Sequence, residues 1–203
     1  MRKINTAILS TLLLSSVALA DDNKQTLVEA LKGTNTFVAV SFGYSNLNVT
    51  NKGTVSLNEK LNESANNFNI ELGYEYSKKI DISLNYKRVN LDDVGLDNIY
   101  ISSKYKLAQD KNLIPYLGLN LGYSQLSWDK NPINTPTNDV ESGSLLIGAM
   151  IGTLYKVTNN LSLDVNYQLD YMRHKTKIEN YPESSELIHD YLQSVNLGIR
   201  YSF

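Results

Sequence analysis

Apolar and polar positions alternate strictly along FNIELGYEY, residues 68–76. Phe, Ile, Leu and two Tyr residues occupy one parity, whereas Asn, Glu, Gly and Glu occupy the other. A period of two predicts a β-strand with one apolar and one polar face. In a soluble sheet the apolar face packs on a core, but in an outer-membrane barrel it meets lipid while the polar face lines the interior. The alternation alone is compatible with both arrangements.

The same alternation recurs in eight segments of roughly ten residues, the length that crosses a bilayer at a tilt. The connections after the second, fourth and sixth segments are short turns, and those after the odd segments are longer. The predicted outer loops are 49–66, 90–97, 127–142 and 174–189. We therefore predict an all-β fold, an eight-stranded antiparallel up-and-down transmembrane β-barrel over residues 36–203, with short periplasmic turns and long outer loops.

Two features favour a lipid-facing apolar side. The polar parity is rich in Gly, Ser and Asn, which fit the narrow interior of an eight-stranded barrel. Aromatic residues gather at the ends of the apolar parity, as expected for girdles at the two lipid–water interfaces. The predicted periplasmic girdle consists of Tyr74, Tyr76, Tyr105, Tyr155, Tyr201 and Phe203, and the outer girdle of Tyr44, Tyr86, Tyr123, Tyr167, Tyr171 and Tyr191.

The N-terminus has the pattern of a secretory signal peptide over residues 1–20. Arg2 and Lys3 precede a hydrophobic run that ends in Ala18-Leu19-Ala20. Residues 21–35 form a predicted periplasmic lead-in before the barrel. Without residues 1–20 the chain carries 17 basic and 21 acidic residues, a balance that gives no reason to expect nucleic acid. The chain has no cysteine, which excludes disulfides and thiolate metal sites.

With this leader, eight amphipathic segments and the terminal stretch GIRYSF, the chain resembles the small eight-stranded outer-membrane barrels: the OmpA membrane domain, OmpX and opacity-like proteins. The resemblance covers residues 36–203. It implies an integral protein of the Gram-negative outer membrane that contacts lipid and lipopolysaccharide. The aromatic residue at the end of the last strand resembles the signal that the barrel-assembly machinery recognises.

The inward parity contains charges of both signs. Glu75, Asp81, Lys104 and Arg200 are placed toward the periplasmic end, with Glu71 a little higher, so we predict a lumen charge network. OmpA-type barrels carry such a plug, and the resemblance implies the same here. On the outward parity, Arg88 and Arg173 lie at the loop-side ends of their strands. They are candidates for contact with lipopolysaccharide phosphates, although snorkelling to the interface explains them equally well.

Three functions remain open from the sequence. The first is a structural or surface-interaction role, such as envelope integrity or adhesion through the outer loops to a host or surface ligand. The second is a narrow pore for ions or small solutes, gated by the lumen charges. The third is a lipid A-modifying enzyme centred on His174 or His189. No nucleophile, metal-binding or phosphate-binding motif is present, so we predict no catalytic residues and no cofactor.

Overall fold

The computed structural model describes residues 33–53, 64–91, 94–108, 111–128, 141–180 and 183–203. The predicted signal peptide and most of the predicted lead-in lie outside these ranges. The strands are β1 Thr36–Gly53, β2 Ser64–Glu75, β3 Ile80–Asn90, β4 Val94–Lys106, β5 Leu113–Trp128, β6 Glu141–Lys156, β7 Leu161–Asn180 and β8 Glu183–Ser202. Within the described ranges, no helix is long and apolar enough to cross a membrane.

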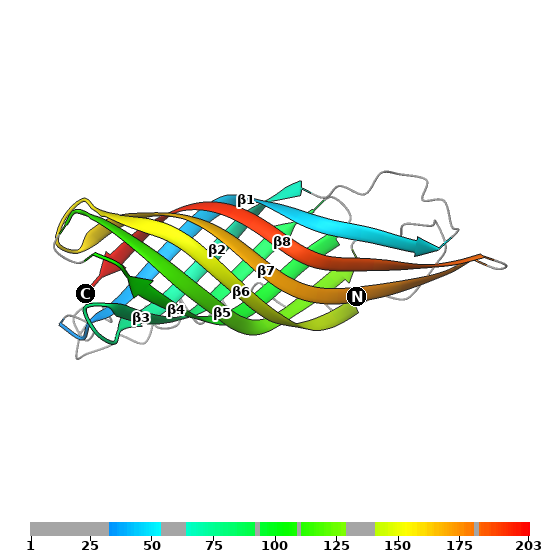
Figure 1. Ribbon diagram of the computed structural model, residues 1–203, viewed down its shortest axis with the longest axis horizontal. Coiled ribbons are helices and arrows are strands. Elements are labelled where there is room, and N and C mark those ends of the chain that lie inside the picture. Colours follow the sequence, from blue (N-terminus) through cyan, green and yellow to red (C-terminus); the bar gives the residue numbers. More distant parts are fainter. Residues whose placement is uncertain (1–32, 54–63, 92–93, 109–110, 129–140, 181–182) are drawn as a thin grey trace, which may run out of the picture.

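The eight strands form one closed barrel in sequence order, with every neighbouring pair antiparallel (Figure 1). The ring closes where β1 pairs with β8, from Phe37 opposite Ser202 to Gly53 opposite Ser185. Near the C-terminus, the Phe203 amide donates a hydrogen bond to the Thr36 carbonyl at 2.9 Å. Closure leaves no unpaired strand edge along the barrel wall. The predicted fold class is therefore confirmed.

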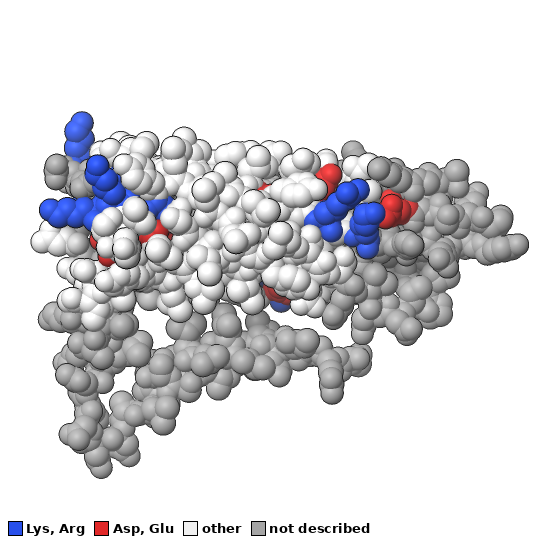
Figure 2. All heavy atoms as spheres, turned by 60° about the horizontal axis from the view of Figure 1, so that its bottom comes forward, with Lys and Arg blue, Asp and Glu red and all other residues white. Residues whose placement is uncertain are grey.

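The alternation of the sequence becomes the two faces of the barrel wall. In β2, Leu72 and Tyr74 are exposed on the outside, whereas Asn69 and Glu71 are buried inside. Most of the large side chains on the outer face are apolar or aromatic, and Leu119 at 69% exposure is the extreme case. Figure 2 shows charged residues gathered toward the two ends of the described barrel, with a mostly uncharged surface between them. This outer surface suits a hydrocarbon environment.

The strands extend further on the loop side than the sequence pattern predicts. The predicted loop 174–189 is wrong, because β7 continues to Asn180 and β8 begins at Glu183. The two strands stay paired through this stretch, and Lys175 Nζ lies 3.1 Å from a Glu186 carboxylate oxygen. Leu187, Ile188 and His189 are buried although they lie on both parities, so pairing continues where the apolar–polar alternation has stopped.

The other loop boundaries shift in the same direction. The predicted loop 49–66 is shorter, because β1 runs to Gly53 and β2 begins at Ser64. The predicted loop 90–97 largely disappears, because β4 begins at Val94. The predicted loop 127–142 agrees to within two residues, and residues 129–140 lie outside the described ranges. As a result β7, β8 and β1 rise beyond the rest of the barrel at one end (Figure 1).

Candidate functional site

The interior near the short turns is filled by a cluster of four charged residues. Arg200 donates hydrogen bonds of 2.6 Å to Asp81 and to Glu75. Lys106 Nζ lies 2.7 Å from Asp81 and 3.7 Å from Glu75. Two positive and two negative charges therefore balance. We call these four residues the inner ion cluster.

Aromatic packing supports the inner ion cluster from β1. The Arg200 guanidinium carbon lies 3.5 Å from the centroid of the Phe37 ring, a cation–π contact. Phe37 is paired with Gly73 on β2, and a side chain at position 73 would collide with the ring. Glycine at this place lets the ring lie flat against the wall beneath the guanidinium.

A second group of charges lies deeper in the barrel. Lys104 donates a 2.8 Å hydrogen bond to Glu71, and its Nζ lies 3.5 Å from Asp164. Tyr116 donates a 2.7 Å hydrogen bond to Asp164. All three charged side chains are at least nine-tenths buried. We call Glu71, Lys104 and Asp164 the central triad.

The predicted lumen network is thus divided in two by the structure. Glu75, Asp81 and Arg200 come together as expected, but Lys104 pairs with Glu71 and Asp164 instead. The prediction missed Lys106, which completes the inner ion cluster. Its signal was present, since Lys106 has the same inward parity as Lys104.

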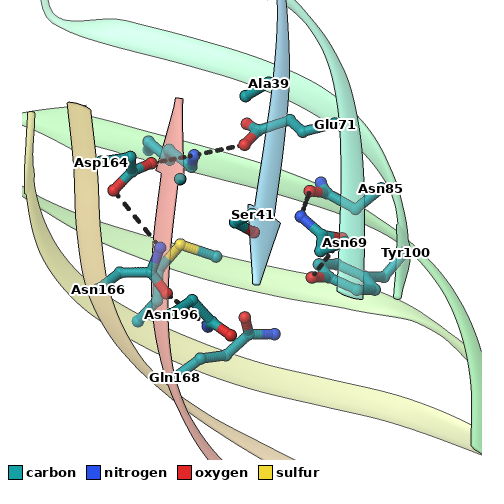
Figure 3. Close-up of a pocket in the computed structure, with 13 residues that line it drawn as sticks. Ala39, Ser41, Asn69, Glu71, Asn85, Tyr100, Asp164, Asn166, Gln168 and Asn196 are labelled. Atoms are coloured by element: carbon teal, nitrogen blue, oxygen red, sulfur yellow. Dashed lines mark hydrogen bonds and ion pairs between the residues drawn. The ribbon is translucent and has the colours of Figure 1, made fainter. Parts of the chain in front are cut away.

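A small polar cavity lies beside the central triad (Figure 3). Its volume is about 20 Å³, enough for water. The polar side chains in its lining include Ser41, Asn69, Glu71, Lys104, Asp164, Asn166 and Asn196. Asn196 donates a 2.8 Å hydrogen bond to the Asn166 amide oxygen. The cavity is therefore built mainly from amide and carboxylate groups.

A third buried pair lies further toward the outer loops. Lys87 is fully buried and donates a 2.7 Å hydrogen bond to the Ser194 hydroxyl. Its Nζ lies 4.0 Å from Asp170, which accepts hydrogen bonds from Gln168 at 2.7 Å and Asn120 at 3.2 Å. This pair is internally neutral, and its remaining bonds go to uncharged side chains.

Further toward the outer loops, buried apolar side chains form one cluster. The residues of this cluster are Leu47, Ala65, Val89, Leu91, Val94, Leu96, Tyr100, Leu126, Leu146, Met172 and Leu192. Leu96, Leu126 and Leu146 are completely buried. We call this group the outer apolar cluster. The prediction from the sequence, that the inward parity is rich in Gly, Ser and Asn, did not anticipate these apolar side chains.

The two histidines face inward beside the outer apolar cluster. His174 and His189 are paired across β7 and β8, just beyond the paired Tyr171 and Tyr191 of the predicted outer girdle. Both rings are buried, and a 2.9 Å hydrogen bond joins His174 Nε2 to the Ser124 hydroxyl. Burial lowers the pKa of each imidazole to about 4. Neutral, enclosed rings of this kind fill space, and neither is accessible from the lipid side.

The aromatic residues of both predicted girdles lie on the outward parity. Every tyrosine in the two sets is exposed except Tyr86, which is half-buried, as is Phe203. Tyr171 packs on Tyr191 with ring centroids 5.2 Å apart, and Tyr201 packs on Phe203 at 5.1 Å. These placements agree with the predicted girdles, whose contact with the lipid interfaces remains a prediction.

The two outward arginines differ in their surroundings. Arg88 Nη1 lies 3.4 Å from Asp97, which also accepts a 2.6 Å hydrogen bond from Tyr86. Arg173 is exposed, and its backbone amide donates a 2.7 Å hydrogen bond to the Ser144 hydroxyl. Arg88 is therefore partly neutralised by a neighbour, which weakens its candidacy for lipopolysaccharide contact relative to Arg173.

Comparison with solved structures gives the same fold. Neisserial surface protein A matches with a TM-score of 0.59 at 21% identity, over 83% of this chain and 97% of that one. OprG of Pseudomonas aeruginosa matches at 0.58 and 11% identity, over 83% and 96% of the two chains. The N-terminal barrel domain of Pseudomonas aeruginosa OprF matches at 0.50 and 17% identity, over 85% and 100%. At such identities the likeness is one of fold.

A comparison with curated proteins gives no match. The profile described as "Opacity family porin protein" matches residues 64–203, which is more than half of the chain and includes β2 to β8. This agrees with the resemblance noted from the sequence. The chain belongs to the Opacity porin family and is an integral outer-membrane β-barrel.

Proposed function

We propose that this protein is a closed barrel that acts at the cell surface, with a structural or adhesive role. One observation carries the proposal: the interior is filled at successive levels, while three strands extend beyond the rest of the barrel at its outer end (Figure 1). The inner ion cluster, the central triad and the outer apolar cluster occupy most of a lumen that eight strands make narrow. A filled lumen favours a function located outside it.

The projecting strands support the surface role. Residues 174–180 of β7 and 183–189 of β8 stay paired, and 49–53 of β1 pair with β8 on its other side. A paired platform loses less conformational entropy on binding than a free loop does, and therefore suits contact with a host or surface ligand. Arg173 and Lys175 follow Tyr171 of the outer tyrosine set along β7 and are both exposed.

Lipid and biogenesis partners follow from the outer face and the last strand. The two tyrosine sets suit anchoring at the lipid interfaces, and exposed Arg173 suits lipopolysaccharide phosphates. Phe203 at the end of β8 suits recognition by the barrel-assembly machinery. An Arg173→Gln variant would sediment with less lipopolysaccharide than the wild type, whereas Arg88→Gln, the matched control, would change little.

The closed lumen is tested by electrical recording. The barrel reconstituted in planar bilayers is expected to give no reproducible single-channel steps at neutral pH. Steps of constant size that disappear when Lys104 is replaced would instead establish the narrow pore, which is the alternative that the polar cavity favours. The barrel must first show heat-modifiable migration, so that only folded protein is tested.

The surface role is tested by shortening the projecting hairpin. Lys175 and Ile188 are paired, so an Asn-Gly turn between them replaces residues 176–187 without changing the register. Cells carrying this variant are expected to adhere less to host cells, while their detergent resistance stays at the wild-type level. If adhesion persists and detergent resistance falls, the role is envelope integrity.

Lipid A modification is not supported by the positions of the histidines. His174 and His189 are buried inside the barrel, whereas an acyl chain would approach from the lipid. We expect identical lipid A mass spectra from cells with and without the protein. A mass shift that His174→Gln abolishes would establish the enzyme instead.

A further inference from the structure

The projecting part of the barrel is a three-stranded sheet made of β7, β8 and β1. Among the described residues, the ladder between β6 and β7 ends at the pair of Ile147 and Tyr171, and the ladder between β1 and β2 ends at the pair of Asn46 and Ser64. Beyond these levels the described parts of β7, β8 and β1 pair with one another (Figure 1). The projecting sheet is therefore held to the rest of the barrel by its own three strands and by side-chain contacts.

The ladders of the projecting sheet are interrupted at its base. The register between β7 and β8 shifts between Tyr171 and His174, and the register between β1 and β8 shifts between Leu47 and Val49. Asp190 of β8 lies within both shifts. Irregularities of this kind bend a strand and disrupt the ladder locally. The sheet therefore meets the barrel at a bend in which the backbone pairing is weakest.

Two side-chain contacts cross the interior from this base to β5, which is not a neighbour of β7 or β8 in the barrel. His174 Nε2 lies 2.9 Å from the Ser124 hydroxyl. The His189 ring meets the Trp128 ring edge-on, with centroids 5.9 Å apart. Trp128 in turn packs against the outer apolar cluster. The two histidines therefore link the projecting sheet to β5 across the interior.

The surroundings of the two rings favour their neutral forms. The described groups that meet them from β5 and β6 are uncharged: Ser124, Trp128 and the backbone of Ser142. The described charged side chains near them in sequence are Arg173, Lys175, Glu186 and Asp190. Lys175 pairs with Glu186, and Asp190 accepts a 2.8 Å hydrogen bond from Asn48 of β1. Burial lowers the pKa of both imidazoles to about 4, and charge on His174 lowers that of His189 further.

We propose that acid releases the projecting sheet from the barrel, because protonation of His174 and His189 drives both rings out of the interior and opens the outer end at the bend beside Asp190. The two residues are paired directly across β7 and β8, so two positive charges there repel each other. An imidazolium is also costly to keep in a buried position. If this sheet is the contact surface, as proposed above, its presentation to a ligand depends on pH.

The release is tested by hydrogen exchange of the folded barrel, followed for individual amides from neutral pH to about pH 4.5. Between the ordinary pKa of 6.5 and the closed-state pKa of about 4, opening takes up protons. Each ring then shifts the opening equilibrium by up to roughly tenfold per pH unit. After correction for intrinsic exchange, protection in 174–180 and 183–189 is expected to fall by up to roughly a hundredfold per pH unit. Protection of the strands below the paired Tyr171 and Tyr191 is expected to persist.

Three variants locate the effect. His189→Gln leaves one titrating ring, so the fall in protection is expected to shrink to about tenfold per pH unit. In His174→Gln/His189→Gln the protection of the hairpin should no longer depend on pH. Arg173→Gln, the matched control, removes an exposed charge beside His174 and should keep the wild-type slope. If the double variant fails to show heat-modifiable migration, the halved slope of His189→Gln decides.

A second measurement needs no label, because Trp128 is the only tryptophan of the chain. Its contact with His189 is lost on release, so acrylamide is expected to quench its fluorescence more strongly in acid than at neutral pH.

Hairpin protection and Trp128 quenching that do not change with pH would overturn the proposal. Protection lost equally from all eight strands would also overturn it, since the whole barrel would then be unfolding. Neither readout involves a ligand, so a failure here leaves the proposed surface role standing, and a failed adhesion test leaves the release standing.

Discussion

The two ends of the barrel interior are closed by different means. Near the short turns, Arg200 and Lys106 hold Asp81 and Glu75 in an ionic cluster. Near the outer loops, the interior is filled instead by the outer apolar cluster, which consists of leucines and other apolar residues. Ion pairs are directional and fail when one partner is removed, whereas apolar packing adapts to change. The difference predicts that the inner end tolerates substitution less well than the outer end.

The largest effect is expected from Asp81→Asn. This change leaves Arg200 and Lys106 sharing Glu75 alone, and breaking a buried ion pair costs about 3–5 kcal/mol. Urea unfolding of the barrel in detergent or lipid vesicles measures the loss. A loss below about 1 kcal/mol would show that water already compensates these charges, and the contrast between the two ends would then fail.

A smaller loss is expected from Leu126→Ala in the outer apolar cluster. The side chain is completely buried, and truncating a buried leucine costs about 3 kcal/mol. The matched control is Leu119→Ala in the same strand, where the side chain faces outward. Lipid fills the space left at position 119, so the free energy of unfolding should fall clearly less in Leu119→Ala than in Leu126→Ala. Equal losses would contradict the inside–outside assignment of β5.

The histidines make the outer end sensitive to pH. At pH 7 they are mostly neutral in both states, but between the ordinary pKa of 6.5 and the folded pKa of about 4 the unfolded chain takes up protons that the folded chain does not. Stability therefore falls as the pH falls through this window, by up to about 1.4 kcal/mol per pH unit for each ring. The free energy of unfolding is measured against pH for the wild type and for a His174→Gln/His189→Gln variant. The difference between the two slopes gives the contribution of the histidines. Parallel slopes would show that both rings are hydrated.

The smallest effect is expected at the outer surface. Arg88 and Asp97 are each about one-third exposed, and exposed pairs contribute about 0.5 kcal/mol. Arg88→Ala should therefore change the free energy of unfolding by less than about 1 kcal/mol, and high salt should remove the difference. If Arg88→Ala lowered the free energy of unfolding as much as Asp81→Asn does, the buried ion pairs would contribute no more to stability than the exposed pair.

Strand parity was the part of the fold that the sequence predicted best. Each of the predicted girdle tyrosines lies on the outward parity, and Glu71, Asp81, Lys104 and Arg200 lie inside. Parity is reliable here because a one-residue shift would exchange the lipid and interior faces of a whole strand. The pairing of Lys104 was less predictable, since it depends on strand tilt and side-chain reach across the lumen.

The outer end was harder to predict for a physical reason. Leu96, Leu126 and Leu146 point inward among apolar neighbours, so apolar residues occur on both parities and the alternation fades. Beyond the outer tyrosines, Leu187 and Ile188 are buried on opposite parities, and a charged residue such as Lys175 occurs in the paired strands. A pattern based on one apolar and one polar face therefore ends before the strands do.

The orientation of the wall is tested most directly by fluorescence quenching at single cysteines. The chain has no native cysteine, so Leu119→Cys and Lys175→Cys each carry one label in lipid vesicles. The label at position 119 is expected to be quenched by nitroxide groups on lipid acyl chains and protected from aqueous iodide, and the label at position 175 to behave in the opposite way. Iodide quenching at position 119 without lipid quenching would contradict a barrel whose apolar face meets the membrane.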